Sequence, residues 1–437
     1  MIELMQCPIC GNKHFKNLDY MRDQLYWYNL DLKEKNEPIG FEICLECGFV
    51  TYNYMEIEKL KQHYDRERPV MNANNIVTCN RKNEYHSKFL KEFFENVKFK
   101  NNILDVGCAQ GAFLNFMQHK IAEKTGLCVS KIGTYGTEWS KGFRNFAKYE
   151  YCLENITTEI IEHQYTFISY YHVLEHIQYP EFELKKIRKL LSDDGYLYVS
   201  VPIWFEKLDE PSMSDCRDFE NLFHLNHINV FSKTSFKNLL KKCGFEIIKE
   251  NNIYYGYTVL CKKCEISNNI EKENPEEIEK KLNNYRDAIE LFNQKKYLDA
   301  INLVPTYTDA YLGLSLDRDN MKNFEIQKDI LSKCIEINKD DIKILLRLAK
   351  LFLQWDENTP EKSGFFSNNI KESERIFNYL LDIKGGNEEV YWYLSKIEFF
   401  YKKNIDKAVE HMRNVYKINP FKYFDCINQI AMYWKAK

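Results

Sequence analysis

The alternation of hydrophobic and polar positions divides the chain into three parts. Between residues 84 and 264, apolar runs of strand length alternate with segments of helical periodicity. Residues 275–437 show only helical periodicity, and they follow the polar, charged run EISNNIEKENPEEIEKK. Residues 1–80 are set apart by two pairs of cysteines. Because 437 residues are too many for one hydrophobic core, the pattern predicts three domains with these bounds.

The central part has the pattern of an α/β domain. NNILDVG predicts a strand that ends in a glycine turn, and AFLNFMQHKIAEK predicts the helix after it. IGTYGTEW, FISYYHVL and GYLYVSVP predict further strands, whereas PEFELKKIRKLL and KTSFKNLLKKC predict helices, the second ended by Gly244. YYGYTVLCKK predicts a last, antiparallel strand. This alternation is typical of a doubly wound, mostly parallel sheet.

The C-terminal part resembles tetratricopeptide repeats. Trp392, Ala408 and Pro420 stand near the large, small and proline positions of such a unit, and a similar unit begins at DAYLGLSL. We therefore expect an all-α, tetratricopeptide-like domain, with a plain helical bundle as the alternative. Stacked repeats form a concave surface that binds a protein partner. They can also cover the neighbouring domain or mediate dimerisation.

Composition and charge narrow the class of protein. Apolar residues make up 44% of the chain, and the net charge of −3 provides no strongly basic surface for nucleic acid or anionic lipid. The start, MIELMQCPICG, lacks the apolar core of a signal peptide, and no apolar run is long enough to span a membrane. Fourteen cysteines without such a signal predict reduced thiols and a cytoplasmic location.

The paired cysteines have the spacing of a metal site. Each C-x-x-C turn directs two sulfurs at one centre, and Gly11 and Gly48 follow directly, as tight knuckle turns require. Four thiolates fill the coordination sphere of zinc, so we expect a structural ion that holds this segment folded. Four unrelated buried cysteines are the alternative. The predicted ligands are Cys7, Cys10, Cys44 and Cys47.

Two strand ends carry the residues of a nucleotide-type site. LDVGCAQG places Asp105, Gly107 and Gly111 at a strand-to-helix turn, where glycines allow a ligand to approach the backbone. The next strand ends in YGTEW, so Glu138 can accept hydrogen bonds from ribose hydroxyls. NAD and S-adenosylmethionine enzymes share this pair, and the pair alone does not separate them.

The order of motifs resembles class I S-adenosylmethionine-dependent methyltransferases. ILDVGCAQGAFL, YGTEWS, YYHVLEHIQYPEFELKKIRKLLSDDGYLYVSVP and HLNHINVFSKTSFKNLLKKCGFEI follow one another as in that family. CLECGFVTYNYMEIEKLKQHYD resembles the zinc knuckle and lead-in helix of a bacterial subgroup that methylates sugar nucleotides and surface polysaccharides. The resemblance covers roughly residues 1–260. It implies a seven-stranded sheet whose last two strands form an antiparallel hairpin, with S-adenosylmethionine as cofactor.

The resemblance also implies a set of cofactor residues. Asp105 would position the methionine end, Glu138 would hold the ribose, and Trp139 would lie beside the adenine. Two positions depart from the family pattern, because Ala109 replaces a common glycine and Thr166 stands where an Asp often begins the fourth strand. The full set is Asp105, Gly107, Ala109, Gly111, Phe113, Glu138, Trp139, Asn155 and Tyr171.

Histidines near the strand ends are candidates for the catalytic base. Methyl transfer to a hydroxyl needs removal of the acceptor proton, which suits an imidazole with a pKa of about 6.5. The candidates are His172, His176, His224 and His227. YYHVLEHI also matches the H-x-x-E-H pattern of inverted zinc proteases. A protease site of that kind needs both histidines on one regular helix. Here the sequence predicts a strand, followed by a helix that begins at Pro180. Glu175 and His176 also allow a divalent cation at the active site.

We expect an S-adenosylmethionine-dependent methyltransferase that acts on a sugar hydroxyl of a nucleotide-linked or surface glycan. The enzyme class follows from the series of motifs, and the sugar follows only from the family resemblance. Methylation of a sugar carbon, a phosphoramidate-type capsule group or RNA is the alternative within the class. A tetratricopeptide scaffold with a decayed methyltransferase domain is the alternative from another class.

Overall fold

The computed structural model describes most of the chain and divides it into two compact units. The described residues are 6–18, 41–52, 61–62, 64, 73–97, 102–204, 227–253, 256–358, 367–384 and 387–435. The first unit takes its residues from 1–69, 92–207 and 215–286, and the second from 70–91, 208–214 and 287–437. The division into domains at 1–80, 84–264 and 275–437 remains a prediction.

A seven-stranded sheet forms the centre of the first unit. Its strands are β4 (Asn102–Val106), β5 (Gly133–Thr137), β6 (Asn155–Thr157), β7 (Tyr165–Tyr171), β8 (Leu191–Val201), β11 (Phe245–Ile253) and β12 (Gly256–Lys263). They lie in the order β11-β12-β8-β7-β4-β5-β6. The five strands from β6 to β8 are parallel, whereas β12 is antiparallel to both of its neighbours. The predicted α/β sheet with an antiparallel hairpin at its edge is confirmed.

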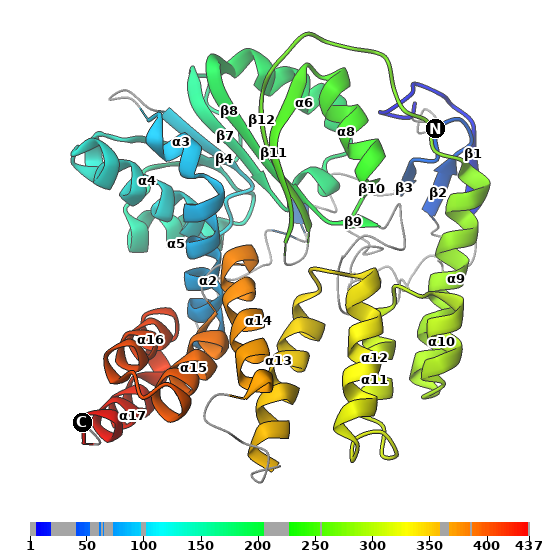
Figure 1. Cartoon of the computed structure of the whole chain (residues 1–437). Coiled ribbons are helices and arrows are strands. Elements are labelled where there is room, and N and C mark those ends of the chain that lie inside the picture. Colours follow the sequence, from blue (N-terminus) through cyan, green and yellow to red (C-terminus); the bar gives the residue numbers. More distant parts are fainter. Residues whose placement is uncertain are drawn as a thin grey trace. The chain divides into compact units, whose positions relative to one another are not determined.

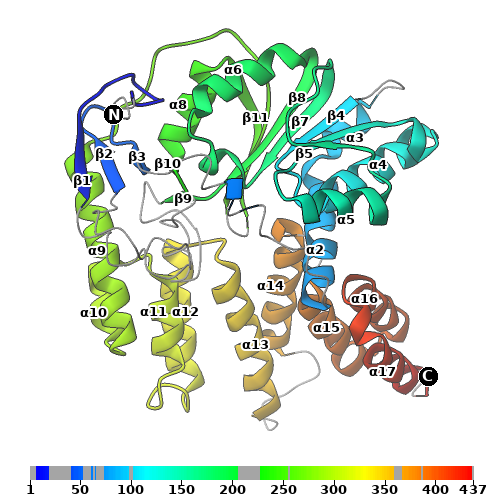
Figure 2. The same ribbon diagram turned by 180° about the vertical axis from the view of Figure 1, so that it is seen from behind.

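Helices cover both faces of this sheet, which buries its strands on both sides (Figures 1 and 2). One face carries α3 (Lys91–Glu95), α4 (Ala112–Thr125) and α5 (Lys141–Tyr151), and the other carries α6 (Pro180–Leu190) and α8 (Lys233–Lys242). Local signals set where these helices begin. Pro180 occupies the first turn of α6, the Ser140 hydroxyl accepts from Phe143 N at the start of α5, and Ser232 and Ser235 cap α8 reciprocally.

A second, smaller sheet connects the N-terminal strands to the methyltransferase-like region. It consists of β1 (Phe15–Leu18), β2 (Phe41–Cys44), β3 (Val50–Tyr52), β10 (Asn229–Ser232) and β9 (Ile203–Trp204). β3 pairs antiparallel with β10, and the Thr51 hydroxyl donates to Ile228 O at 2.9 Å. Phe236 of α8 is fully buried between Phe231 of β10 and Tyr257 of β12. The pairing of β3 with β10 was not predicted from the sequence.

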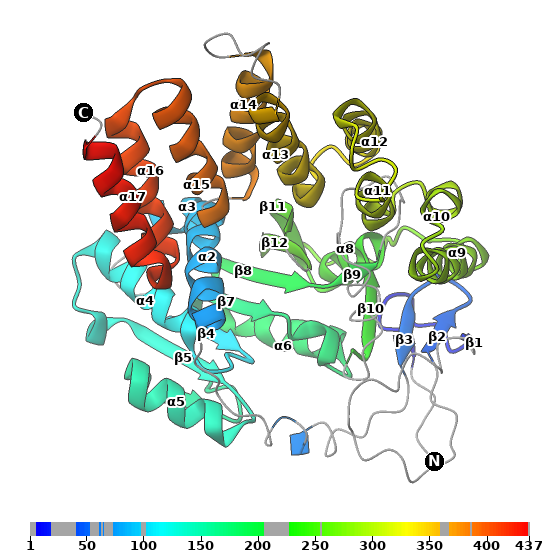
Figure 3. The same cartoon turned by 90° about the horizontal axis from the view of Figure 1, so that it is seen from below.

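The second unit is helical, as the C-terminal pattern predicts (Figure 3). It contains α2 (Ala73–Phe89), whose Lys88 Nζ donates to Leu381 O at 3.0 Å. Its other elements are α10 (Tyr297–Leu303), α11 (Thr308–Ser315), α12 (Phe324–Ile337), α13 (Ile342–Asn358), α14 (Asn368–Lys384), α15 (Glu388–Lys396), η7 (Ile397–Tyr401), α16 (Ile405–Ile418), η8 (Pro420–Lys422) and α17 (Tyr423–Lys435). α9 (Pro275–Asn293) begins in the first unit and ends in the second. Within the described parts of the chain, no helix has the length and apolar character to cross a membrane.

Candidate functional site

The carboxyl ends of the parallel strands surround a cavity of about 520 Å³. Gly107 follows β4, Glu138 follows β5, Thr158 follows β6 and His172 follows β7. β4 is the first strand of the sheet, and the chain continues from it to β5 on one side before it returns to β7 on the other. Ligands of open α/β sheets bind at such a reversal, because the loops on the two sides diverge there.

The structure brings part of the predicted site together around this cavity. The predicted residues that line it are Gly107, Ala109, Glu138, Trp139, Tyr171, His172 and His176. Those that do not line it are Asp105, Gly111, Phe113, Asn155 and His227. His224 lies outside the described residues, as do most of the predicted lead-in helix and all of residues 205–226.

The turn after β4 depends on backbone conformations that most side chains do not tolerate. Gly107 has a φ of +68°, and a Cβ at this position would lie 2.5 Å from a methyl group of Val173. Gly107 N donates to the Thr137 hydroxyl at 3.2 Å, which joins the ends of β4 and β5. Ala109 also has a positive φ, of 47°, so the departure from glycine is accommodated with strain.

Glu138 is buried and anchors the turn. Its Oε2 accepts from Ala109 N at 3.0 Å, and its Oε1 accepts from Ser140 N at 2.7 Å. A carboxylate has about four acceptor positions, so it can accept from several donors at once. Glu138 can therefore fix the glycine turn and still accept a ribose hydroxyl.

Asp105 lies at the end of β4 but is buried beneath the cavity surface rather than lining it. Its Oδ1 accepts from the Ser169 hydroxyl at 2.7 Å. Burial raises the pKa of this carboxyl to about 7, since the nearby charge of Glu138 adds to the effect and the Ser169 hydrogen bond only partly offsets it. Asp105 is thus poised between its two protonation states near neutral pH.

Two other predicted residues support the site from outside the cavity. The Phe113 ring stacks on Tyr171 and Tyr198, with ring centroids 6.4 and 5.8 Å apart, so it holds the Tyr171 wall in place. Asn155 Nδ2 donates to Thr134 O at 3.2 Å and ties the start of β6 to β5.

The H-x-x-E-H segment is not a regular helix. His172 has a φ of +56° directly after β7, and its N–H donates to Ser200 O at 2.9 Å. Glu175 and His176 lie in η5 (Leu174–His176), a single 3₁₀ turn. The helix that an inverted zinc protease needs is therefore absent from residues 172–176, all of which the structure describes.

Three histidines surround the carboxylate of Glu175, which is 1% exposed. Its Oε1 lies 3.6 Å from His172 Nδ1 and 3.7 Å from His176 Nε2, and the rings of His176 and His227 are 4.9 Å apart. Burial acts to raise the pKa of Glu175, but the contact with His172 and the charges of the three imidazoles outweigh it, so the pKa is lowered. Glu175 is thus ionised at neutral pH.

Sequence reasoning missed the residues that hold this cluster and close the cavity. Asn229 is 2% exposed, and its Nδ2 donates to Leu174 O at 3.2 Å and to Ile177 O at 2.7 Å, which fastens the 3₁₀ turn to β10. Tyr64 packs edge-on against Trp139 and His176. The cavity-lining residues that were not predicted from the sequence are Lys61, Tyr64, Val106, Thr137, Phe143, Thr158, Glu159, Ile160, Val173, Ile177, Gln178, Tyr179, Phe182, Glu183 and Lys186. No local pattern in the sequence marks Asn229 or these lining residues.

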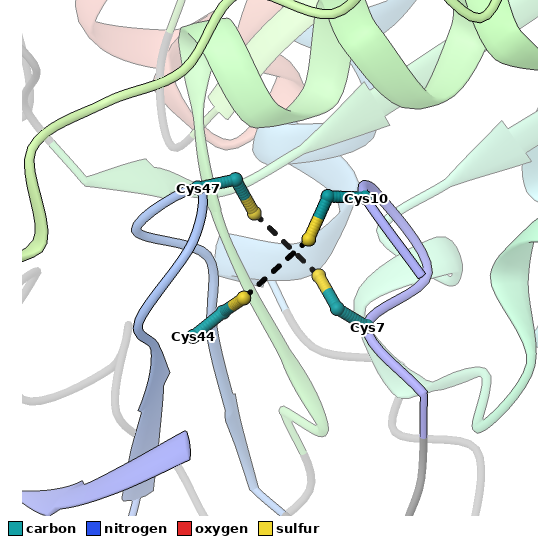
Figure 4. Close-up of side chains that lie close together, drawn as sticks. All are labelled: Cys7, Cys10, Cys44 and Cys47. Atoms are coloured by element: carbon teal, nitrogen blue, oxygen red, sulfur yellow. Dashed lines mark hydrogen bonds between the residues drawn. The ribbon is translucent and has the colours of Figure 1, made fainter. Parts of the chain in front are cut away.

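The four N-terminal cysteines converge on one point (Figure 4). Cys7 Sγ lies 3.6 Å from Cys47 Sγ, and Cys10 Sγ lies 3.5 Å from Cys44 Sγ. Zinc–sulfur bonds of about 2.3 Å in a tetrahedron separate the sulfurs by about 3.8 Å, so the spacing fits a zinc ion and is far too long for disulfides.

The backbone around the cysteines has the knuckle form that such a site needs. Gly11 N donates to Cys7 O and Gly48 N donates to Cys44 O, both at a positive φ. A Cβ at Gly48 would lie 2.3 Å from Ile278 Cδ1, so the start of α9 packs directly on the second knuckle. Close approach to the neighbouring thiols raises the pKa of Cys47, which a divalent cation between the sulfurs would reverse.

Comparison with known proteins identifies the domain at the strand-end cavity. Residues 79–250 match the family model of a methyltransferase domain. Together with the strand order, this match shows that the region is a class I S-adenosylmethionine-dependent methyltransferase domain.

The relatives extend over only part of the chain. (S)-Coclaurine N-methyltransferase from Thalictrum flavum subsp. glaucum is 28% identical over 142 residues, which are 30% of this chain and 39% of that protein. The chain therefore spans less than half the length of this curated relative.

Two solved structures of methyltransferases are similar to part of the chain. Magnesium protoporphyrin IX methyltransferase from Synechocystis PCC 6803, with bound S-adenosylhomocysteine, is 12% identical with a TM-score of 0.35 over 48% of this chain and 100% of that one. An S-adenosylmethionine-dependent methyltransferase from Aquifex aeolicus is 15% identical with a TM-score of 0.30 over 44% and 98%. Similarities of this size carry no inference about substrate.

A Gly107→Ala variant tests the close approach at the turn. The added methyl group would meet Val173 beside the cavity, so we expect the affinity for S-adenosylmethionine to fall by more than about tenfold. Gly126→Ala is the matched control, because Gly126 has a φ of +69° but no atom within 4 Å of a Cβ. This variant should lose about 1 kcal/mol of stability and keep its affinity in isothermal titration. Equal affinity losses in both variants would contradict the steric explanation.

Asp105 predicts a pH dependence of stability in the ligand-free protein. Its pKa of about 7 in the folded state exceeds its ordinary value of 3.8, so between these values the folded state binds a proton that the unfolded state does not. This contribution to stability is present at low pH and is lost as the pH rises to 7. An Asp105→Asn variant has no carboxyl to titrate, so its stability does not fall with pH for this reason. The difference in free energy of unfolding, variant minus wild type, should therefore rise by about 2 to 3 kcal/mol between pH 5 and pH 8.

Urea denaturation of the two proteins at both pH values measures this difference. Asp193→Asn is the control, because the Asp193 side chain is fully exposed and its removal should leave the pH profile unchanged. A difference between Asp105→Asn and wild type that does not vary with pH would contradict the raised pKa.

Proposed function

We propose that the protein is an S-adenosylmethionine-dependent methyltransferase that methylates a sugar hydroxyl of a nucleotide-linked or surface glycan. The observation that carries the enzyme class is the strand-end cavity with the Gly107 turn and Glu138, in a domain that matches the methyltransferase family. The resemblance of the zinc-knuckle region and the motif order to glycan-modifying methyltransferases supports the sugar acceptor.

In this proposal the cofactor supplies a methyl group activated on a sulfonium sulfur. The Gly107 turn would lie along its methionine part, Glu138 would accept from its ribose, and Trp139 would lie beside its adenine. Tyr64 packs against the Trp139 ring. Asp105 would stabilise the cationic end of the cofactor when ionised, and its pKa of about 7 allows this at neutral pH.

The acceptor side of the cavity contains the histidines. His172 and His176 line it, and the buried Glu175 carboxylate lies 3.6 and 3.7 Å from their nearest ring nitrogens. The oxygen–carbon bond forms as the sulfur–carbon bond breaks, the hydroxyl proton passes to an imidazole, and neutral S-adenosylhomocysteine leaves. Because a single side chain rarely accounts for more than part of the barrier, removal of the base should slow the reaction without abolishing it.

We also propose that Cys7, Cys10, Cys44 and Cys47 hold a structural zinc ion. The tetrahedral spacing of the sulfurs supports this assignment. The ion would connect β2 to the first knuckle and thereby fix the sheet that contains β3 and β10. Its effect on the reaction would be indirect, through the position of β10.

For the helical unit we propose a tetratricopeptide-like surface that binds a protein partner. Successive helices pack in pairs, as in α13 with α14 and α15 with α16, which supports a repeat architecture. A chain truncated after Asn293, which keeps the part of α9 on the second knuckle, should still methylate a soluble acceptor if the unit only recruits a partner. Dimerisation or coverage of the active site would instead change turnover.

Incubation with radiolabelled S-adenosylmethionine and a pool of sugar nucleotides tests the proposed reaction. We expect label in a sugar, and a His176→Ala or His172→Ala variant should lower kcat by about 10²- to 10⁴-fold if that histidine takes the proton. His163→Ala is the control, since His163 is exposed and outside the cavity.

Each result of this assay discriminates between acceptors. Label in RNA or in a carbon-linked methyl group would replace the sugar hydroxyl as acceptor. If the protein neither binds S-adenosylmethionine nor transfers its label, the domain is a scaffold and the proposed enzyme is wrong.

Metal analysis of the wild type and of a cysteine variant tests the proposed zinc site. We expect one zinc ion per chain by mass spectrometry of the metal content, and a Cys44→Ser variant should lose it together with several degrees of melting temperature. Cys128→Ser, at an exposed cysteine away from the cluster, is the control. Full stability of the cysteine variant with no zinc in the wild type would contradict a structural ion.

A further inference from the structure

The carboxylate of Glu175 is buried, and one of its two oxygens lacks a hydrogen bond. Oε1 lies 3.6 and 3.7 Å from the nearest imidazole nitrogens, distances too long for hydrogen bonds. Oε2 is buried and has no hydrogen-bond partner in the part of the chain that the structure describes. Because a buried carboxylate oxygen without a hydrogen bond is costly, a bound group is expected beside it.

The surrounding side chains are arranged as metal ligands. One carboxylate oxygen of Glu175 and one ring nitrogen each of His176 and His227 all lie within 4.8 Å of one another. Ligand bonds of about 2.0 to 2.2 Å place such atoms about 3 to 4 Å apart around a common ion. The 3.7 Å between Glu175 Oε1 and His176 Nε2 falls in this range, and His227 brings a third ligand atom to the same place.

The fold holds this arrangement from two sides. Asn229 fastens the turn that carries Glu175 and His176 to β10, the strand that follows His227. On the other side, His172 is held at a positive φ, and its ring packs near Gly256 of β12, where a Cβ would lie 3.2 Å from His172 Cε1. A strained residue and a buried clamp around one carboxylate indicate a preorganised site rather than a chance cluster.

We propose that Glu175, His176 and His227 bind a divalent first-row transition-metal cation at the wall of the cavity. Two imidazoles and one carboxylate suit zinc, manganese, iron, cobalt or nickel, whereas magnesium and calcium prefer oxygen ligands throughout. This site is separate from the cysteine cluster, which has only sulfur ligands.

The role of the cation in catalysis rests on the proposed function, although its binding does not. His176 lines the cavity, so the ion would lie beside an acceptor hydroxyl there. A bound divalent cation lowers the pKa of a hydroxyl that coordinates it, which is the activation that O-methylation requires. His172 then remains as a cavity histidine that is not a ligand.

Titration of the full-length protein with Mn²⁺ tests the site, because electron paramagnetic resonance of free Mn²⁺ disappears on binding. No chelator is used, so metal at the cysteines is retained. We expect one Mn²⁺ per chain, and at least about tenfold weaker binding in Glu175→Gln and in His227→Ala. Glu162→Gln and His163→Ala replace exposed residues of the same types outside the cluster and should bind as wild type does.

The proposal is overturned if the wild type binds neither Mn²⁺ nor a zinc ion beyond that at the cysteines, or if His227→Ala binds Mn²⁺ as tightly as wild type. Circular dichroism identifies any variant that misfolds, and His227→Ala decides the question if Glu175→Gln does so. Mn²⁺ binding without methylation of any sugar would refute the proposed acceptor and leave the metal site intact. Sugar methylation without metal binding would refute the metal site alone.

Discussion

The parallel pairing of β4 with both β5 and β7 is the constraint on which the site depends. β4 is the first strand of this sheet, and β5 and β7 lie on its two sides. The loops after these strands therefore turn away from each other at the carboxyl ends and leave a cavity between them. Gly107 permits the first loop to fold tightly, and Glu138 fixes it through the backbone of Ala109. Gly107, Ala109 and Glu138 therefore take their positions from the ends of β4 and β5.

A second constraint connects the N-terminal strands to the histidine cluster. The cysteine knuckles hold β2, β2 pairs with β3, and β3 pairs with β10. Asn229 at the start of β10 then fastens the turn that carries Glu175. These contacts connect the N-terminal cysteines to the turn that carries Glu175. The cysteine cluster and the histidine cluster are nevertheless separate sites. The same contacts explain why the segment with the four cysteines belongs to the first compact unit.

Local patterns in the sequence predicted the strands, the glycine turn and the cysteine ligands, because each depends on neighbouring residues. The count of seven strands and the antiparallel hairpin at the end of the sheet followed from family resemblance. The pairing of β3 with β10 could not be predicted, since it joins short strands about 180 residues apart and no local pattern encodes that contact. Asn229 was missed for the same reason, because a lone Asn before a strand carries no sign that its amide will clamp a distant turn. Tyr64 and Lys61 likewise reach the cavity from outside the strand-end loops.

A crystal structure of the protein with S-adenosylhomocysteine tests the central claim most directly. The account predicts the cofactor product in the cavity at the ends of β4, β5 and β7, with its ribose hydroxyls within hydrogen-bond distance of Glu138 and its adenine beside Trp139. A product bound elsewhere, or a Glu138 carboxylate without a hydrogen bond to the ribose, would contradict it.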